Sequence, residues 1–263
     1  MNIYKTHFVD KESDITIISD SKKAINRAKS SFKIHRKNLE DYTQNNSTFL
    51  KSFSPVNVVS NYKIINLMTD VSSICNVGPM AAVAGALADL MLGVMKTKGD
   101  NEKGEICKIA LVENGGEIAI DSEEPMKIAL YAGQNSLNLN IGFLITKEDC
   151  PIGIGTSSAT VGHAISLGQS DAVTVFAENA ALADAAATMV GNAVRGKDIE
   201  KSIKRGLEIA DKIKGVRAAF ISREDKVGQI GHLPQLIKIE GDKDLILKNK
   251  LEDHFIGDFE IYK

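Results

Sequence analysis

An aspartate and a threonine one helical turn apart are the residues in this sequence best placed to do chemistry. Asp184 and Thr188 lie in the run Ala-Leu-Ala-Asp-Ala-Ala-Ala-Thr. Residues at i and i+4 share a helix face, so a carboxylate and a hydroxyl can point at one atom, and the alanines leave them unshielded. Such oxygens suit Mg²⁺, whose shell is completed by water and phosphate. Alternatively, Asp184 pairs with a lysine or arginine, and Thr188 bonds back to the carbonyl four residues earlier.

A second candidate is the segment from Pro151 to His163, which is dense in glycine, serine and threonine. Hydroxyls and backbone N–H groups at short spacing are typical of loops that hold phosphate or another anion, here at 153–158. The P-loop pattern is missing, because no Gly-Lys-Ser/Thr follows. The alternative is a flexible structural loop.

Small residues also fill the start of a helix predicted after Gly78. Pro79 suits the first helical position, where its missing N–H would have no partner anyway. The first two turns carry almost no bulky side chain, so a ligand could approach the backbone closely. Tight packing of the helix on a sheet is the alternative. Asp89 interrupts the apolar run that ends at Met95, so we expect a buried helix and not a membrane span.

The elements that must position these groups read as an α+β fold. Strand-like runs follow one another without helices between them, and Asn114-Gly115-Gly116 is a tight turn between two of them, so the sheet is predicted to be mostly antiparallel. The predicted strands are 14–19, 56–67, 108–112, 117–120, 126–131, 137–145, 171–177, 216–222, 227–230, 236–240 and 255–262. The predicted helices run from 20 or 21 to about 37, from 79 to about 91, from 180 to about 194 and from 198 to about 214. The polar stretch 39–54 is either a fraying helix or a surface connection.

Composition sets limits on the class of protein. The chain has 263 residues and no linker-like segment, which favours one domain over 1–263, with 14–54 packed on it. The net charge of −2 gives no reason to expect nucleic acid or an anionic membrane as a partner. Three separated cysteines and no signal peptide indicate reduced thiols in a cytoplasmic protein. A sulfur-transfer role for Cys75 or Cys107 stays open as a minor alternative.

Four segments, in one order and spanning about 75–230, resemble motifs of the ApbE family. The strongest is Val-Thr-Val-Phe-Ala-Glu-Asn-Ala-Ala-Leu-Ala-Asp-Ala-Ala-Ala-Thr, which is similar to the family's strand-plus-helix signature. The others are Val83-Ala-Gly-Ala-Leu-Ala-Asp89, Val112-Glu-Asn-Gly-Gly-Glu117, and Thr156-Ser-Ser158 with His163. The resemblance rests on the shared order of the four segments as well as on each segment.

ApbE proteins are flavin transferases that cleave FAD and attach FMN to a serine or threonine of a target protein. The resemblance implies an ApbE-like fold related to the tunnelling fold, with Mg²⁺ held by Asp184, Thr188 and the backbone carbonyl of Val83. It implies His163 as a further catalytic residue, FAD or FMN as a nucleotide-like ligand, a protein acceptor and a homodimer. The residues expected to bind the cofactor are Gly78, Val83, Gly85, Asp89, Asn114, Gly115, Gly116, Thr156, Ser157 and Ser158.

The sequence also departs from that family. Ala84 and Ala86 stand where the family has lysine and tyrosine, and the family's His-Ile-Ile-Asp-Pro-x-Thr-Gly stretch is missing. The chain therefore resembles a divergent, cytosolic branch. Two functions follow as alternatives: a metal-dependent transferase or binder of a flavin nucleotide or related pyrophosphate, and a non-catalytic accessory protein, which the resemblance links to sulfide assimilation.

Overall fold

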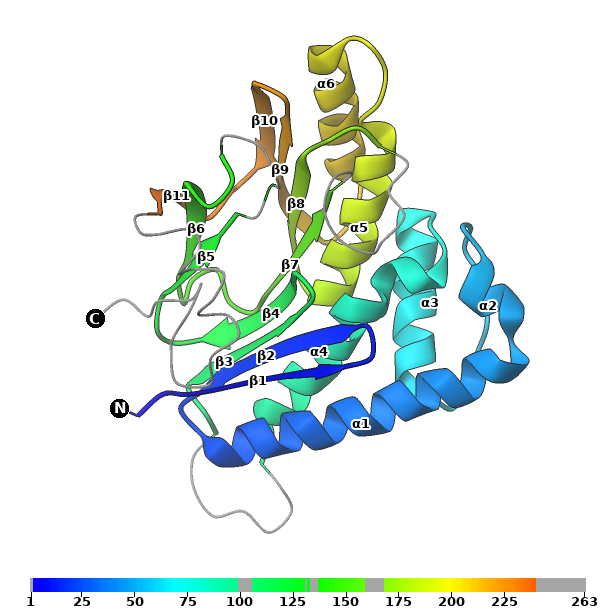
Figure 1. Cartoon of the computed structure of the whole chain (residues 1–263), viewed down its shortest axis with the longest axis vertical. Helices are drawn as coiled ribbons and strands as arrows, with labels where there is room; N and C mark the ends of the chain where they lie inside the picture. Colours follow the sequence, from blue (N-terminus) through cyan, green and yellow to red (C-terminus); the bar gives the residue numbers. More distant parts are fainter. Residues whose placement is uncertain (1, 99–105, 131, 133–136, 159–167, 240–263) are drawn as a thin grey trace.

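The computed structural model describes residues 2–98, 106–130, 132, 137–158 and 168–239, which form two antiparallel sheets and a set of helices (Figure 1). The strands are β1 (Tyr4–Asp10), β2 (Ser13–Ser19), β3 (Ile109–Asn114), β4 (Glu117–Ser122), β5 (Met126–Ala129), β6 (Ile141–Ile145), β7 (Ile152–Ser157), β8 (Ala172–Ala177), β9 (Val216–Arg223), β10 (Lys226–Gly231) and β11 (Gln235–Lys238). The helices are α1 (Lys22–Asn45), α2 (Ser47–Lys51), α3 (Lys63–Cys75), a 3-10 turn η1 (Pro79–Ala82), α4 (Val83–Met95), α5 (Ala180–Ala193) and α6 (Ile199–Ala210).

The larger sheet has the strand order β1-β2-β3-β4-β7-β8-β9-β10, and the smaller one has the order β11-β6-β5. Every pair of neighbouring strands is antiparallel. This confirms the α+β fold and the antiparallel sheet predicted from the sequence.

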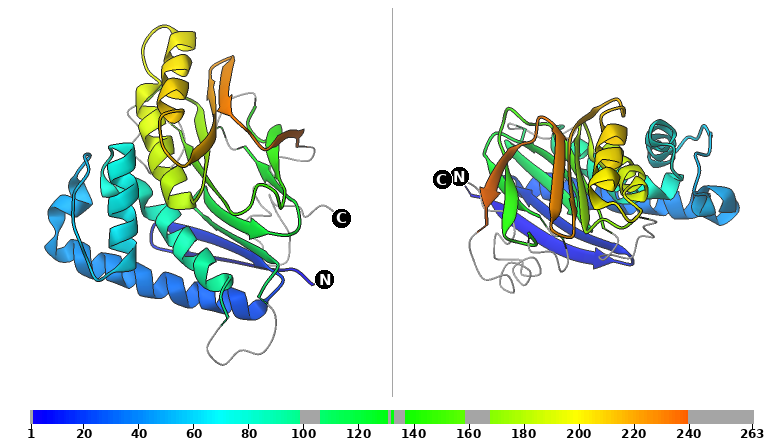
Figure 2. Two further views of the ribbon diagram at one scale, coloured as in Figure 1. Left: turned by 180° about the vertical axis from the view of Figure 1, so that it is seen from behind. Right: turned by 90° about the horizontal axis from the view of Figure 1, so that it is seen from above.

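The larger sheet separates two hydrophobic cores, one under the helices and one under the smaller sheet (Figure 2). Strand β9 shows how its sequence serves both cores. Ala219 and Ile221 face the helices, whereas Ala218 and Phe220 face the smaller sheet. Successive side chains of a strand point to opposite faces, so apolar residues at both parities predict a strand that is covered on both sides.

Helices α4 and α5 form the centre of the helical layer. Helix α4 packs on β3 and β4, α5 packs on β7 and β8, and the two helices contact each other. The long helix α1 is capped by Ser21, whose hydroxyl accepts from the N–H of Ala24, and it packs against α4 (Figure 1).

Three sequence-based element assignments are wrong. The segment 56–67 was expected to be a strand, but its second half begins α3. Ile64, Ile65, Met68 and Cys75 are buried on that helix, so its apolar positions follow the helical period. Helix α1 continues to Asn45, because Leu39 is buried beyond the predicted end at about residue 37.

The third correction concerns the glycine-rich segment, which was expected to be an anion-binding loop at 153–158. Residues up to Ser157 form β7, an inner strand paired with β4 and β8. Glycine in a strand marks a close approach of other backbone, and that is its use here. Strand β1, which was not among the predicted strands, forms an edge of the larger sheet.

Within the described ranges, no single helix is long and apolar enough to cross a membrane. Helix α3 and the segment 79–95 together have the length and apolar composition of a span, but the two parts are bent by 102° relative to each other.

Candidate functional site

Glycines bring the backbones of α4, α5 and β7 into direct contact. A Cβ atom at Gly85 would lie 2.2 Å from the carbonyl oxygen of Ala180, and one at Gly155 would lie 2.5 Å from the backbone of Ala183. Gly153 meets the backbone of Asn179 in the same way. No side chain fits at these positions, so the glycines fix where α5 lies on the sheet and beside α4.

The carboxylate of Asp184 caps the start of α4. Its Oδ2 accepts a hydrogen bond from the backbone N–H of Gly85 at 3.0 Å, and the N–H of Ala84 contributes as well. The residue at the N-cap position of α4 is Ala82, which has no side-chain acceptor. Asp184 therefore stabilises a helix start that its own sequence leaves uncapped.

Asp89 makes the reciprocal contact. Its two carboxylate oxygens accept from the N–H groups of Ala180 and Ala181, at 2.9 and 2.7 Å. The next N–H of α5, that of Leu182, donates to the side chain of Asn179. The first turn of α5 is thus satisfied by protein groups, and its N–H groups are not available to a ligand.

Burial affects both carboxylates. It raises the pKa of Asp184 to about 7, although the N–H groups of α4 oppose the shift, and the negative charge of Asp89 raises it further. Burial likewise raises the pKa of Asp89 to about 6 against the bonds from α5. A cation placed against Asp184 would offset the unfavourable burial of its charge.

Asn114 connects the Asn-Gly-Gly turn to the same helix start. Its buried side-chain amide donates to the carbonyl oxygen of Ala84 at 3.2 Å. The turn itself needs its glycines, because Gly115 and Gly116 both have positive φ. The structure therefore gathers three of the predicted motifs around the first turn of α4: the Val83–Asp89 segment, the Asn-Gly-Gly turn and the helix of Asp184.

Residues of the glycine-rich segment divide between the two faces of the larger sheet. Ser157 faces α5, where its hydroxyl would lie 3.2 Å from a Cβ at Gly191, one turn beyond Thr188. Thr156 points to the opposite face and its hydroxyl lies 3.3 Å from that of Thr174. The hydroxyls of Thr156 and Ser157 therefore lie on opposite faces of the sheet, because alternate residues of a strand face opposite sides.

The remaining predicted residues are less closely connected. Gly78 lies against the backbone of Ser52, where a Cβ would be 1.8 Å from the carbonyl oxygen. Thr188 is half-buried on α5, and Ser158 follows β7 directly. His163 lies outside the described residues.

The predicted metal ligands are one carboxylate, one hydroxyl and one carbonyl, from Asp184, Thr188 and Val83. Among the residues that the structure describes, no group of three or more His, Cys, Asp and Glu side chains could hold a metal ion. The three predicted donors are all oxygen atoms. This is the type of donor that a hard cation such as Mg²⁺ prefers, and Mg²⁺ usually completes its shell with waters and substrate phosphates.

A groove of about 300 Å³ opens beside the start of α5. It is lined by Asp89, Glu178 and Asn179, and by Lys96, whose amine lies 3.3 Å from the carboxylate of Asp121. The groove adjoins the capping arrangement, so a ligand bound there would lie next to the N-terminal end of α5.

Sequence reasoning missed the reciprocal capping. It singled out both aspartates but could not pair residues that are 91 to 99 positions away from the groups they bind. A signal was present in Gly153 and Gly155, because two glycines at the same parity of a strand indicate that another backbone lies close to that face.

The cysteines do not support a sulfur-transfer site. All three are free thiols, Cys75 and Cys107 are buried, and Cys150 is partly buried. Burial raises the pKa of Cys75 to about 12 and also raises the pKa of Cys107. A reactive cysteine needs the opposite shift.

Solved structures with a similar fold carry the name of the family that the sequence resembles. A point-mutant form of the flavin transferase ApbE from Vibrio cholerae matches with a TM-score of 0.55 at 13% identity, over 88% of this chain and 97% of the other. The ApbE protein from Thermotoga maritima matches with a TM-score of 0.51 at 12% identity, over 85% and 97%. At these identities the likeness shows a shared fold.

Sequence relatives are much closer. The UPF0280 protein of Methanocaldococcus jannaschii is 40% identical over 240 residues, which is 90% of this chain and 94% of the relative. A UPF0280 protein of Methanococcus maripaludis is 40% identical over 96% of this chain and 99% of the relative. The family model described as AbpE bacteria matches residues 2–214. The chain therefore belongs to the AbpE bacteria family, and its 40% identity to UPF0280 proteins over nearly its whole length places it among those proteins as well.

Proposed function

We propose that the chain binds a flavin nucleotide, or a related ligand with a pyrophosphate, at the first turn of α4, together with a divalent cation at Asp184. The observation that carries the proposal is the half-buried carboxylate of Asp184, held against the N–H groups of Ala84 and Gly85. The fold around it is the one found in the flavin transferases ApbE.

The cation has a physical use at this place. Burial disfavours the charged form of the Asp184 carboxylate. One of its oxygens, Oδ2, accepts the hydrogen bond from the N–H of Gly85. Thr188 follows one helical turn later, and Val83 begins the helix that Asp184 caps. Bound Mg²⁺ would supply charge neutralisation for the pyrophosphate.

The second part of the proposal concerns the reaction that the chain would catalyse. By analogy with the structural neighbours, the reaction would be transfer of FMN from FAD to a protein acceptor. Two residues of α4, Ala84 and Ala86, argue against transferase activity. Ala86 is fully buried in the helical core, so no aromatic ring can take its place without displacing other groups. Ala84 offers its carbonyl to Asn114 but has no charged side chain. These two positions favour the alternative, a binding protein without transferase activity.

A binding titration tests the site. The full chain is titrated with FAD, with and without Mg²⁺, and flavin fluorescence reports binding. We expect Mg²⁺ to tighten binding, and Asp184→Asn and Thr188→Val each to weaken the Mg²⁺-dependent part by about tenfold, since tenfold corresponds to about 1.4 kcal/mol. Matched controls are Asp198→Asn, at a helix cap on α6, and Thr43→Val, a helical threonine on α1.

Chromatography of the same mixtures separates the two functions. Release of AMP and free FMN from FAD, with water taking the FMN group in place of the protein acceptor, would support the transferase if it requires both Mg²⁺ and Asp184. Mg²⁺-dependent binding without AMP release would support the binding protein. If FAD binds no more tightly with Mg²⁺, or if Asp184→Asn behaves like Asp198→Asn, the proposed site is wrong.

A further inference from the structure

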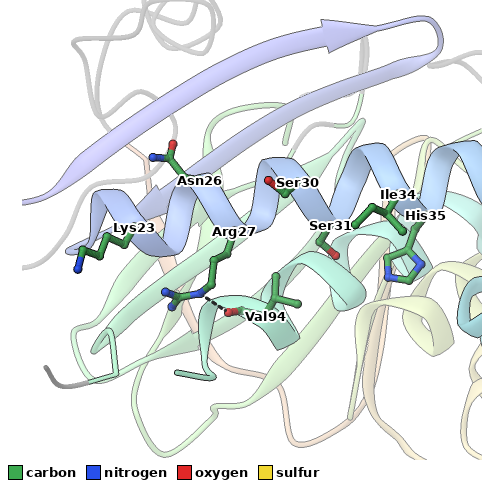
Figure 3. A pocket seen from close by; sticks show the side chains of 8 residues that line it. All are labelled: Lys23, Asn26, Arg27, Ser30, Ser31, Ile34, His35 and Val94. Carbon is green, nitrogen blue, oxygen red and sulfur yellow. Dashed lines mark hydrogen bonds between the residues drawn. The ribbon is translucent and has the colours of Figure 1, made fainter. Parts of the chain in front are cut away.

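A second groove, whose lining does not include Asp184, lies between α1 and α4 (Figure 3). Its volume is about 510 Å³, within the range of about 300–1,000 Å³ that is typical of small-molecule sites. Val94 forms the α4 side of the groove. It is nine residues beyond Gly85, about 13 Å along the helix at about 1.5 Å per residue.

The charge of this groove has one sign. Lys23 and Arg27 line it, and none of the eight lining residues is acidic. Arg27 is held in place because its Nε donates to the carbonyl oxygen of Val94 at 2.9 Å and its guanidinium also donates to that of Met95 at 3.2 Å. The guanidinium is therefore a fixed positive charge in the wall, and Lys23 is an exposed one.

The groove also contains a polar atom that the protein leaves unsatisfied. The Nδ1 atom of His35 is buried and has no hydrogen-bond partner. Buried polar atoms nearly always have a partner, so this unpaired nitrogen marks a part of the groove wall where the protein itself supplies no hydrogen bond. Burial and the charge of Lys63 lower the pKa of His35, so its ring is neutral at pH 7 and can donate one hydrogen bond.

The rest of the lining is mixed. Ile34 is 58% exposed and lies in the groove with Val94. The hydroxyl of Ser30 and the amide of Asn26 come from the same helix. Apolar surface next to positive charge and hydrogen-bond donors matches a ligand that has the same two parts.

We propose that this groove binds a small organic anion with an apolar body, its phosphate, sulfonate or carboxylate group near Lys23 and Arg27 and its apolar part on Ile34 and Val94. Nothing in this site depends on a flavin, on Mg²⁺ or on Asp184. It would be a second ligand site on the same chain.

The probe for this site is 8-anilinonaphthalene-1-sulfonate, an aromatic sulfonate whose fluorescence rises on binding. It is titrated into the full chain without flavin and without Mg²⁺. We expect saturable binding at one site per chain. Lys23→Gln and Ile34→Ala should each weaken it about fivefold, the effect of about 1 kcal/mol. His35→Phe, which keeps a ring but loses its hydrogen-bonding nitrogens, should weaken it as well.

Two matched variants make the test specific. Lys33→Gln removes another exposed lysine of α1 that does not line the groove, and Ile74→Ala shortens an isoleucine that is 51% exposed on α3. Both should bind the probe within twofold of the unmodified chain. Competition by AMP and by octanoate then distinguishes a phosphate ester from a carboxylate as the preferred anion. Equal weakening by the groove and control variants, or no saturable binding at all, would overturn the proposal.

Discussion

Asp89 and Asp184 each place a carboxylate at the start of the helix that carries the other. Asp89 lies on α4 and accepts from the first N–H groups of α5, and Asp184 lies on α5 and accepts from the first turn of α4. Each helix start is therefore stabilised by the middle of the other helix. Any change that shifts one helix along the other breaks both contacts, so the proposed site depends on how closely α4 and α5 pack.

Gly85 controls that packing, and replacing it tests its role. Gly85→Ala places a Cβ 2.2 Å from the carbonyl oxygen of Ala180, so the helices must separate. We expect a loss of unfolding free energy of about 1–3 kcal/mol or more, as for overpacked cores, measured by urea unfolding.

The control is Gly93→Ala in the same helix. A Cβ at Gly93 meets nothing within 4 Å, so alanine should stabilise the chain by about 0.5–1 kcal/mol through its higher helix propensity. If the two variants were equally stable, α4 and α5 would not be packed as described.

Much of this fold could be predicted from the sequence, because most elements carry local signals. The strand predicted at 14–19, the Asn-Gly-Gly turn and the helices predicted to begin at 180 and 198 are confirmed. The prediction of a strand at 56–67 was wrong because a short apolar run fits both the strand and the helix periods.

The site could be predicted only in part. The aspartate–threonine spacing placed Asp184 on a helix, but what it binds there depends on a contact across 99 residues. Local patterns carry no information about such contacts. The glycines of β7 were assigned to ligand binding for the same reason, since the helix that covers them is distant in the sequence.

The cysteines are predicted to react slowly. Cys75 is fully buried, and its pKa of about 12 leaves roughly one thiol in ten thousand ionised at pH 8. With iodoacetamide at pH 8, we expect partly buried Cys150 to be labelled first and Cys75 and Cys107 to stay unmodified, as measured by mass spectrometry of peptides. The same reaction in concentrated urea should label all three. Rapid labelling of Cys75 in the folded chain would bring back the sulfur-transfer alternative.

Arg27 is expected to stabilise the C-terminal end of α4. Its bonds to the carbonyls of Val94 and Met95 satisfy groups that have no partner within the helix. Arg27→Met keeps the length of the side chain and loses these bonds, so we expect a loss of about 1–2 kcal/mol in urea unfolding. Lys33→Met, at an exposed position of α1, should change the free energy of unfolding by less than about 0.5 kcal/mol. Equal stability of the two variants would contradict the capping role.

Asp89 should make the stability of the chain depend on pH. Its pKa is raised from 3.8 to about 6 by burial, so between these values the folded chain holds a proton that the unfolded chain has released. Its contribution to the free energy of unfolding therefore falls as pH rises through this window. Between pH 5 and pH 8 the fall is about 1 kcal/mol, because the unfolded carboxyl is already mostly ionised at pH 5.

Asp89→Asn stays neutral at every pH and so removes this dependence. Thermal unfolding should show the unmodified chain losing roughly 2–4 °C relative to this variant between pH 5 and pH 8. Asp198→Asn is the control, because the backbone N–H of Lys201 lowers the pKa of Asp198, which is then ionised in both states throughout this range. Its difference from the unmodified chain should stay constant. A constant difference for Asp89→Asn as well would mean that Asp89 is not buried against the start of α5.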